Sequence, residues 1–129
     1  MANDFPAGLK YTKDHEWAKT DGGDIVVGIT QFAVEQLGDI TLVSFDAKEG
    51  ATIEKGKAFG TIESVKTLSD LYAPVSGTIV RLNRELENKP ELVNEDCYGK
   101  AWMIAIKPAG AADDLMDATA YAAHVAAAG

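Results

Sequence analysis

The sequence predicts a mainly β protein, a sandwich or flattened barrel of short antiparallel strands, on three observations. Segments in which apolar residues alternate with polar ones recur at short intervals, and glycine turns separate them. The apolar share of 47% and the charged share of 25% are those of an ordinary folded domain. A chain of 129 residues holds one core of usual size, so we expect a single domain over residues 1–129.

Strands are expected where the period of two is clearest. Residues 23–30 place Ile25, Val27 and Ile29 on one face of a half-buried strand, and residues 40–46 alternate in the same way. Three further segments continue the pattern: "KAFGTIESV", "GTIVRLN" and "AWMIAIK". The polar segment 83–99 is expected to be mostly a connection, with one helical turn at most.

Residues 60–80, "GTIESVKTLSDLYAPVSGTIV", are expected to fold back on themselves. Pro74 suits the second position of a turn, and Gly77 supplies backbone freedom. Lys66 then lies at or near an exposed hairpin tip, where a modifying enzyme reaches its amine. Because such a lysine is not desolvated, we expect it to form no Schiff base.

A short helix is expected over residues 31–37, because the local sequence supplies both of its ends. Thr30 suits the N-cap and Gly38 the C-terminal stop, with Phe32, Ala33 and Leu37 at helical spacing.

A second helix is expected near residues 112–127, packed on the outside of the sheet. Asp113 and Asp114 open it at the positive end of the helix dipole, and His124 lies near the negative end. An apolar stripe follows the helical period at Leu115, Ala118, Tyr121, Ala122 and Val125.

Composition excludes several functions. The formal charge of −8 leaves no basic stripe for nucleic acid and favours partners with basic patches. Cys97 is the only cysteine, so it forms neither an intramolecular disulfide nor a cysteine zinc cluster, and we expect a buried or turn thiol. His15 and His124 lie too far apart in sequence to suggest a metal site.

Targeting signals are not recognisable. The sequence has no apolar run long enough to span a membrane, and "MANDFPAGLK" resembles neither a secretory signal nor a transit peptide. We therefore expect a cytoplasmic protein without a membrane partner.

Lys66 lies in "ESVKTLSDLYAPVSGTI", which resembles the lipoyl-attachment segment of glycine cleavage system H proteins. The triplet Val65-Lys66-Thr67 favours this family over the lipoyl domains of 2-oxo acid dehydrogenases, which typically have Asp-Lys-Ala, and over biotin carriers, which have Met-Lys-Met. Further blocks resemble the family in the same order between about Leu9 and Lys107: "LKYTKDHEWAK", "VGITQFAVEQLGDI", "KPELVN" and "YGKAWMIAIKP". The chain departs from the pattern at "SFDAKEG", Cys97, Ala101 and Thr67, and only Thr67 adjoins the lysine.

The resemblance implies the lipoyl-domain-like fold called a barrel-sandwich hybrid, and a carrier rather than an enzyme. Members hold lipoate in amide linkage on the lysine, here Lys66. Glycine decarboxylase (P protein) loads the aminomethyl group of glycine, aminomethyltransferase (T protein) passes the methylene to tetrahydrofolate, and dihydrolipoyl dehydrogenase (L protein) reoxidises the dithiol. A lipoate ligase or an octanoyl or lipoyl transferase attaches the group.

The resemblance also implies a cleft beside the His-Glu-Trp strand in which the loaded arm rests. An aminomethyl cargo with a free amine loses formaldehyde to water, so a carboxylate that keeps the amine protonated protects it. We expect Glu16 to hold this ammonium, with Asp70 second and Asp14 third.

Other interpretations remain open at this stage. His15 and Trp17 suit a plain edge strand with Trp17 in the core. Asp70 suits bracing of the hairpin through backbone N–H groups. The chain also fits a relay that passes octanoyl or lipoyl groups to 2-oxo acid dehydrogenases, or an interaction domain whose lysine is never modified. We expect a monomer.

Overall fold

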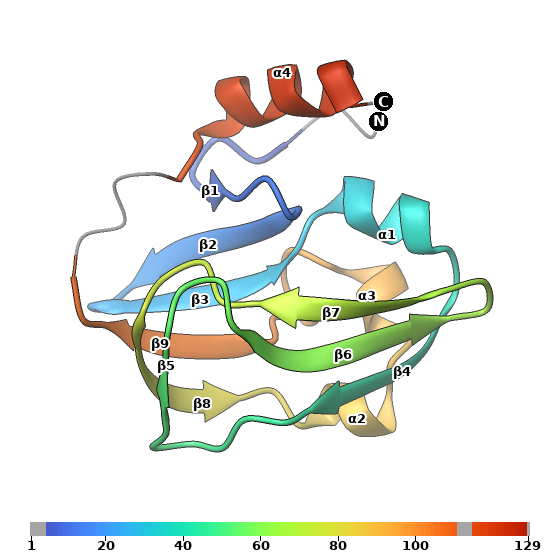
Figure 1. The fold of residues 1–129 in the computed structure, drawn as a ribbon. Helices are drawn as coiled ribbons and strands as arrows, with labels where there is room; N and C mark the ends of the chain where they lie inside the picture. The colour runs from blue at the N-terminus through green and yellow to red at the C-terminus, as the bar shows by residue number, and fades with distance from the viewer. Residues whose placement is uncertain (1–4, 111–114, 129) are drawn as a thin grey trace.

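Two antiparallel sheets face each other in the computed structural model, which describes residues 5–110 and 115–128 (Figure 1). The six-stranded sheet has the spatial order β1 (Lys10–Tyr11), β2 (Glu16–Asp21), β3 (Asp24–Ile29), β9 (Ile104–Pro108), β8 (Gly77–Leu82) and β5 (Thr52–Ile53). The three-stranded sheet has the order β4 (Ile40–Phe45), β6 (Ala58–Ser64) and β7 (Leu68–Tyr72). The arrangement is a flattened sandwich rather than a closed barrel, which confirms the predicted mainly β class.

The main core lies between the two sheets. Val27 and Ile106 from the larger sheet and Val43, Ile62 and Leu71 from the smaller sheet are buried in one cluster. These residues alternate along their strands, so the two-residue period in the sequence correctly predicted that they face the core.

Strand β3 differs from its prediction, because it is buried on both faces. Ile25, Val27 and Ile29 enter the main core as expected. Val26 points the other way and is only 9% exposed, in a second cluster with Tyr11, Trp17, Tyr121 and Val125. The half-buried interpretation was wrong because the C-terminal helix covers the outer face of this sheet (Figure 1).

Helix α1 (Gln31–Leu37) confirms both predicted ends. The Thr30 hydroxyl accepts a hydrogen bond from the Ala33 N–H at 3.3 Å, and Gly38 closes the helix with φ +85°. Positive φ favours glycine, so this position terminates the helix without strain.

Helix α4 (Ala118–Ala128) packs on the outside of the sheet as predicted, but it begins later than expected. Residues 111–114, with Asp113 and Asp114, lie outside the described residues. Met116 exchanges backbone hydrogen bonds with Tyr11 at 2.7 and 2.8 Å, so this part of the chain pairs with β1 instead of coiling. Asp117 caps the helix by accepting from the Ala120 N–H at 2.8 Å.

Two further predictions were wrong: one for the connection after β8 and one for the role of Gly77. The connection after β8 contains two short helices, α2 (Glu85–Asn88) and α3 (Leu92–Glu95), because Leu86 and Val93 are both fully buried against the core. Gly77 does not take a positive φ. Its α-carbon faces the carbonyl of Lys107 on β9, so a side chain there has no room.

Candidate functional site

The β6–β7 hairpin holds Lys66 at its tip, as predicted. The strands pair up to Glu63 and Leu68, and the turn between them leaves the lysine exposed. Ser64 fixes the turn: its N–H donates to the Thr67 carbonyl at 2.8 Å, and its hydroxyl accepts from the N–H groups of Lys66 and Thr67 at 3.3 and 3.2 Å. The sequence interpretation missed this serine, although a hydroxyl two residues before a turn residue is a known turn signal.

The hairpin tip lies beside the end of α1 (Figure 1). The Val65 N–H donates to the Asp39 carbonyl at 3.0 Å. The Lys66 side chain extends over Gly38, where a Cβ added to the glycine would lie 3.3 Å from the lysine Cε. The tip is thus attached to the body by backbone contacts, while the amine itself stays accessible.

A narrow cleft of about 130 Å³ lies between α1, the start of β2 and strand β7. All three predicted acids line it: Asp14 from the turn before β2, Glu16 from the start of β2, and Asp70 from β7. Its apolar walls come from Ile29, Ala33, Leu37, Ile62 and Leu71. Lys66 does not line the cleft, but the end of α1 that lies beside the lysine does. The structure therefore brings the acids together and places the lysine just outside.

Glu16 is buried at the base of the cleft with only 2% of its surface exposed. Its Oε1 accepts from the Thr12 hydroxyl at 2.9 Å, and its Oε2 accepts from the Tyr72 N–H at 3.2 Å. Burial raises the pKa of this carboxyl to about 8, although the two hydrogen bonds act in the opposite direction. The carboxyl is therefore mostly neutral at pH 7.

The turn before Glu16 has a backbone conformation that few residues adopt. His15 has φ +70°, which costs a non-glycine residue on the order of 1 kcal/mol. The Thr12 hydroxyl stabilises the turn by accepting from the N–H groups of Asp14 and Glu16 at 3.2 and 3.1 Å. Thr12 thus fixes both the turn and the carboxyl, and the sequence interpretation missed it because these contacts form only once the turn exists.

The two other acids of the cleft are exposed on its rim. Asp14 lies on the turn surface, and Asp70 is exposed on the edge strand β7. The Asp70 Oδ2 accepts a long hydrogen bond from the Tyr72 hydroxyl at 3.4 Å. Bracing of the hairpin backbone, which the sequence left open for Asp70, falls instead to Ser64.

His15 and His124 come together although they are far apart in sequence. Their rings lie 5.7 Å apart, and His15 Nδ1 lies 2.7 Å from the Tyr121 hydroxyl. Burial and the neighbouring His124 lower the pKa of His15. The argument from sequence separation was therefore wrong, but within residues 5–110 and 115–128 no group of three potential ligands forms a metal site.

Trp17 and Cys97 are structural. Trp17 is 1% exposed, and its indole N–H donates to the Cys97 carbonyl at 2.9 Å, which confirms the core interpretation of this tryptophan. Burial raises the pKa of the Cys97 thiol to about 12, so the thiol stays protonated, as expected of a buried cysteine.

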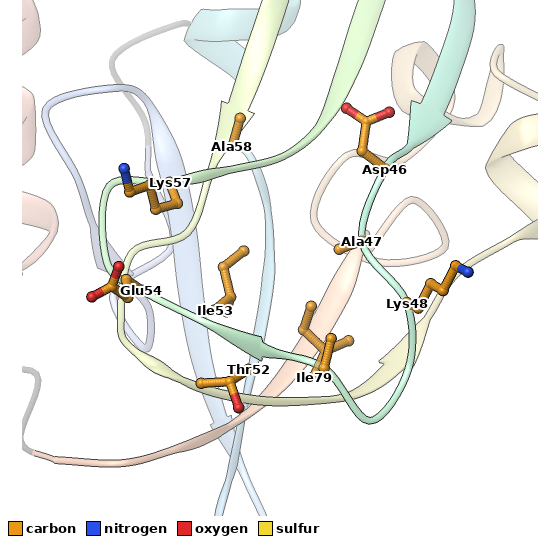
Figure 2. A pocket seen from close by; sticks show the side chains of 10 residues that line it. Asp46, Ala47, Lys48, Thr52, Ile53, Glu54, Lys57, Ala58 and Ile79 are labelled. Carbon is orange, nitrogen blue, oxygen red and sulfur yellow. The ribbon is translucent and has the colours of Figure 1, made fainter.

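Other hollows lie elsewhere in the described part of the chain, and two of them are much larger than the cleft. One of about 430 Å³ opens between the β4–β5 connection and the start of β6, with Ile53, Lys57 and Ile79 in its wall (Figure 2). It lies at the opposite end of β6 from Lys66, roughly 20 Å along the strand. The other, about 560 Å³, lies beside the first turn and His124, and Glu16 lines it as well as the cleft.

The site thus combines an exposed lysine on a fixed hairpin tip with a narrow cleft that contains a buried acid. Comparisons with known proteins identify the family. The sequence model of the family "Glycine cleavage H-protein" matches residues 9–128. The chain therefore belongs to the glycine cleavage H-protein family.

Individual relatives give the same result. The glycine cleavage system H protein of Bacteroides fragilis is 54% identical over 123 residues, which cover 94% of this chain and 97% of the relative. That of Myxococcus xanthus is 47% identical over 125 residues, covering 95% and 96%. The crystal structure of the Mycobacterium marinum H protein superposes with a TM-score of 0.87 at 38% identity, covering 95% of this chain and 99% of that chain.

Proposed function

We propose that Lys66 is the attachment point of the lipoyl group that H proteins carry in the glycine cleavage system. Membership of the family makes this chain a non-catalytic lipoyl carrier that serves the P, T and L proteins. The observation that carries the assignment to Lys66 is its exposed position on a hairpin tip whose backbone Ser64 holds in place. Of the functions that the sequence left open, family membership favours glycine cleavage over the relay and the unmodified interaction domain.

The cleft residues fit a lipoyl arm. The apolar walls contributed by α1, β6 and β7 suit a thin aliphatic chain, and the acids at one end suit an ammonium. When bound, the lipoyl group supplies a dithiolane that takes up the cargo and is afterwards reoxidised. Amide formation removes the charge of Lys66, so the lysine contributes reach and local concentration, without acid or base chemistry.

Glu16 is proposed to hold the cargo ammonium inside the cleft. Its burial excludes water and keeps the empty site mostly neutral, and the positive charge of an ammonium in the cleft lowers the pKa of the carboxyl so that it ionises beside the cation. An ion pair in this environment keeps the cargo amine protonated. A protonated amine has no free lone pair with which to expel the thiolate, so the hydrolysis that releases formaldehyde does not begin. Asp70 and Asp14 are proposed to attract the cation from the rim, where both are exposed.

The intact mass of the protein from its native host, grown with lipoate, tests the attachment. We expect a lipoyl-sized increment that maps to Lys66 by peptide sequencing. A native protein without the increment under these conditions would refute the carrier role of the lysine.

The protective role of Glu16 is tested by formaldehyde release from the loaded protein. We expect faster release from Glu16→Gln than from the wild type, because a neutral amide does not retain the ammonium. The exposed acid Glu54 supplies the control Glu54→Gln, which should behave as the wild type does. Unchanged release from Glu16→Gln would show that another group protects the cargo.

The remaining assignments are also proposals. We propose one lipoyl-carrier domain over residues 1–129 with a C-terminal helical extension, acting as a monomer in the cytoplasm and modified by a lipoate ligase or an octanoyl or lipoyl transferase. The single buried thiol suits a reducing compartment, and the charge of −8 disfavours self-association. Size-exclusion chromatography with light scattering tests the oligomeric state.

Among the described residues, no helix is both long and apolar enough to cross a membrane.

A further inference from the structure

Three large apolar side chains are exposed in the described part of the chain, and all three lie on the lysine hairpin or on the strand paired with it. Leu42 is 42% exposed, Val65 69% and Leu68 58%. Val65 directly precedes Lys66, and Leu68 follows it by two residues. We call these three residues the aliphatic patch.

The sheet register places the patch on one face. Leu42 on β4 pairs with Glu63 on β6, and Glu63 pairs with Leu68 on β7. Directly paired residues point to the same side of a sheet, so both leucines flank Glu63 on the outer face of the three-stranded sheet. Val65 lies beyond the last paired residues, in the turn next to Lys66, and is exposed there. The patch therefore extends from the end of the sheet to the turn that holds the lysine.

Acidic groups border the patch. Glu63 lies between the two leucines, Asp39 is exposed next to Val65, and Asp70 is exposed two residues after Leu68. Lys66 is the only cation within this stretch of the hairpin, residues 58–72. A complementary surface therefore offers an apolar depression flanked by lysine or arginine side chains.

The short side chain of an unmodified lysine indicates which partner binds at the patch. The amine extends only about 6 Å beyond its Cα, so an enzyme that acylates it must contact the protein surface around the tip. Partners that act on the attached group react at its distal end and not at the lysine amine. The enzyme that acts on the bare lysine is therefore the partner that must reach the tip itself.

We infer that the aliphatic patch of Leu42, Val65 and Leu68, with its acidic border, is the docking surface for the acyl-transferring enzyme that modifies Lys66. The inference rests on the proposed attachment at Lys66 and goes beyond it, because it names residues that the attached arm does not use. The acylating enzyme is expected to bind through apolar contact and to be steered by basic residues.

Steady-state lipoylation of the apo protein tests the inference, with a purified lipoate ligase, magnesium, ATP and lipoic acid, read by the mass increment. In Leu42→Ser combined with Leu68→Ser, we expect the KM for the carrier to rise about tenfold with little change in kcat, since two apolar side chains leave the interface. The conservative variant Leu42→Met should keep the wild-type KM. Raising the salt from about 50 to about 300 mM should raise the wild-type KM, because screening weakens steering.

The outcomes separate the two proposals. A wild-type KM in the double serine variant would overturn the docking surface while leaving attachment at Lys66 intact. A wild-type protein that gains no lipoyl mass would overturn the attachment, and the docking surface with it. Both serines replace exposed side chains, and an unchanged melting temperature confirms that the fold is retained. Thr78→Ser, at an exposed position on β8, is the matched control and should leave the KM unchanged.

Discussion

The hairpin tip and the cleft differ sharply in exposure, although only three residues lie between Lys66 at the tip and Asp70 on the cleft rim. At the tip the lysine is exposed, and only backbone and serine contacts hold it. In the cleft Glu16 is almost completely buried and its pKa is strongly raised. Attachment requires access for a large enzyme, whereas protection of a cargo requires exclusion of water. The fold separates these two groups along one short strand: Lys66 lies in the turn before β7, and the Glu16 carboxylate accepts from the Tyr72 N–H at the other end of β7. This separation suits both of the proposed roles.

The largest effect is expected at the tip. Lys66→Arg should abolish the lipoyl increment and all transfer activity, because guanidinium forms no stable amide with the group. Its free energy of unfolding should change by less than about 0.5 kcal/mol, since the residue is exposed. Intact mass and urea denaturation measure the two quantities. Lys57→Arg, near the other end of β6, is the control and should keep both the increment and the stability.

In the cleft, Glu16→Gln should change how stability depends on pH. The folded pKa of about 8 exceeds the ordinary 4.5, so the native state binds the extra proton between these values. The contribution of Glu16 to stability is complete below about pH 4.5 and is lost as the pH rises through about 8. The wild type should therefore lose on the order of 3 kcal/mol relative to Glu16→Gln between about pH 5 and pH 8.

Chemical denaturation of both proteins across this range measures the difference. Parallel curves for the two proteins would mean that the cleft does not desolvate Glu16. Glu54→Gln, at an exposed acid, should reproduce the wild-type curve.

Thr12→Val tests whether the buried carboxyl depends on its turn. The variant removes a donor to Glu16 and the acceptor for two backbone N–H groups. We expect a loss of about 1–3 kcal/mol, greater at pH 8 than at pH 5 because the ionised carboxyl needs the donor more. Denaturant titrations at both pH values measure the loss. An equal loss of stability at both pH values would mean that Thr12 stabilises the turn independently of the ionisation of Glu16. Thr78→Val should cost much less.

The smallest effect is expected for Ser64→Ala at the tip. Water replaces the lost serine contacts at exposed N–H groups, so the stability should fall by only about 0.5 kcal/mol. Amide hydrogen exchange at Lys66 and Thr67 should nevertheless accelerate, because the turn is no longer held. Unchanged exchange would mean that the strand pairing alone fixes the tip. Ser69→Ala on the same hairpin is the control.

Local patterns predicted the fold more completely than the site. The period of two located the strands, and Thr30 and Gly38 located both ends of α1, because these signals lie within a few residues of the structure they determine. Burial of Val26 and the late start of α4 were not predictable in this way. Both depend on pairing and packing between the two ends of the chain.

For the site, the sequence placed Lys66 at a tip from its flanking strands, whereas the convergence of the three acids followed only from family resemblance. The contacts that hold these groups, from Thr12 and Ser64, were not visible beforehand because threonine and serine are common in turns. The raised pKa of Glu16 depends on burial by several elements at once, which no local pattern encodes.

Tyr121 on the last helix contacts two segments that are synthesised much earlier in translation. Its hydroxyl lies 2.7 Å from His15 Nδ1, 106 residues earlier in the chain, and 2.8 Å from the Thr30 hydroxyl that caps α1. The turn before Glu16 and the start of α1 are already joined by the Thr30 N–H, which donates to the His15 carbonyl at 3.0 Å, and every residue that lines the cleft precedes Tyr72 in the chain. During translation the cleft and the lysine hairpin therefore emerge first, and the last helix then adds a side-chain contact that braces both the turn and the helix cap.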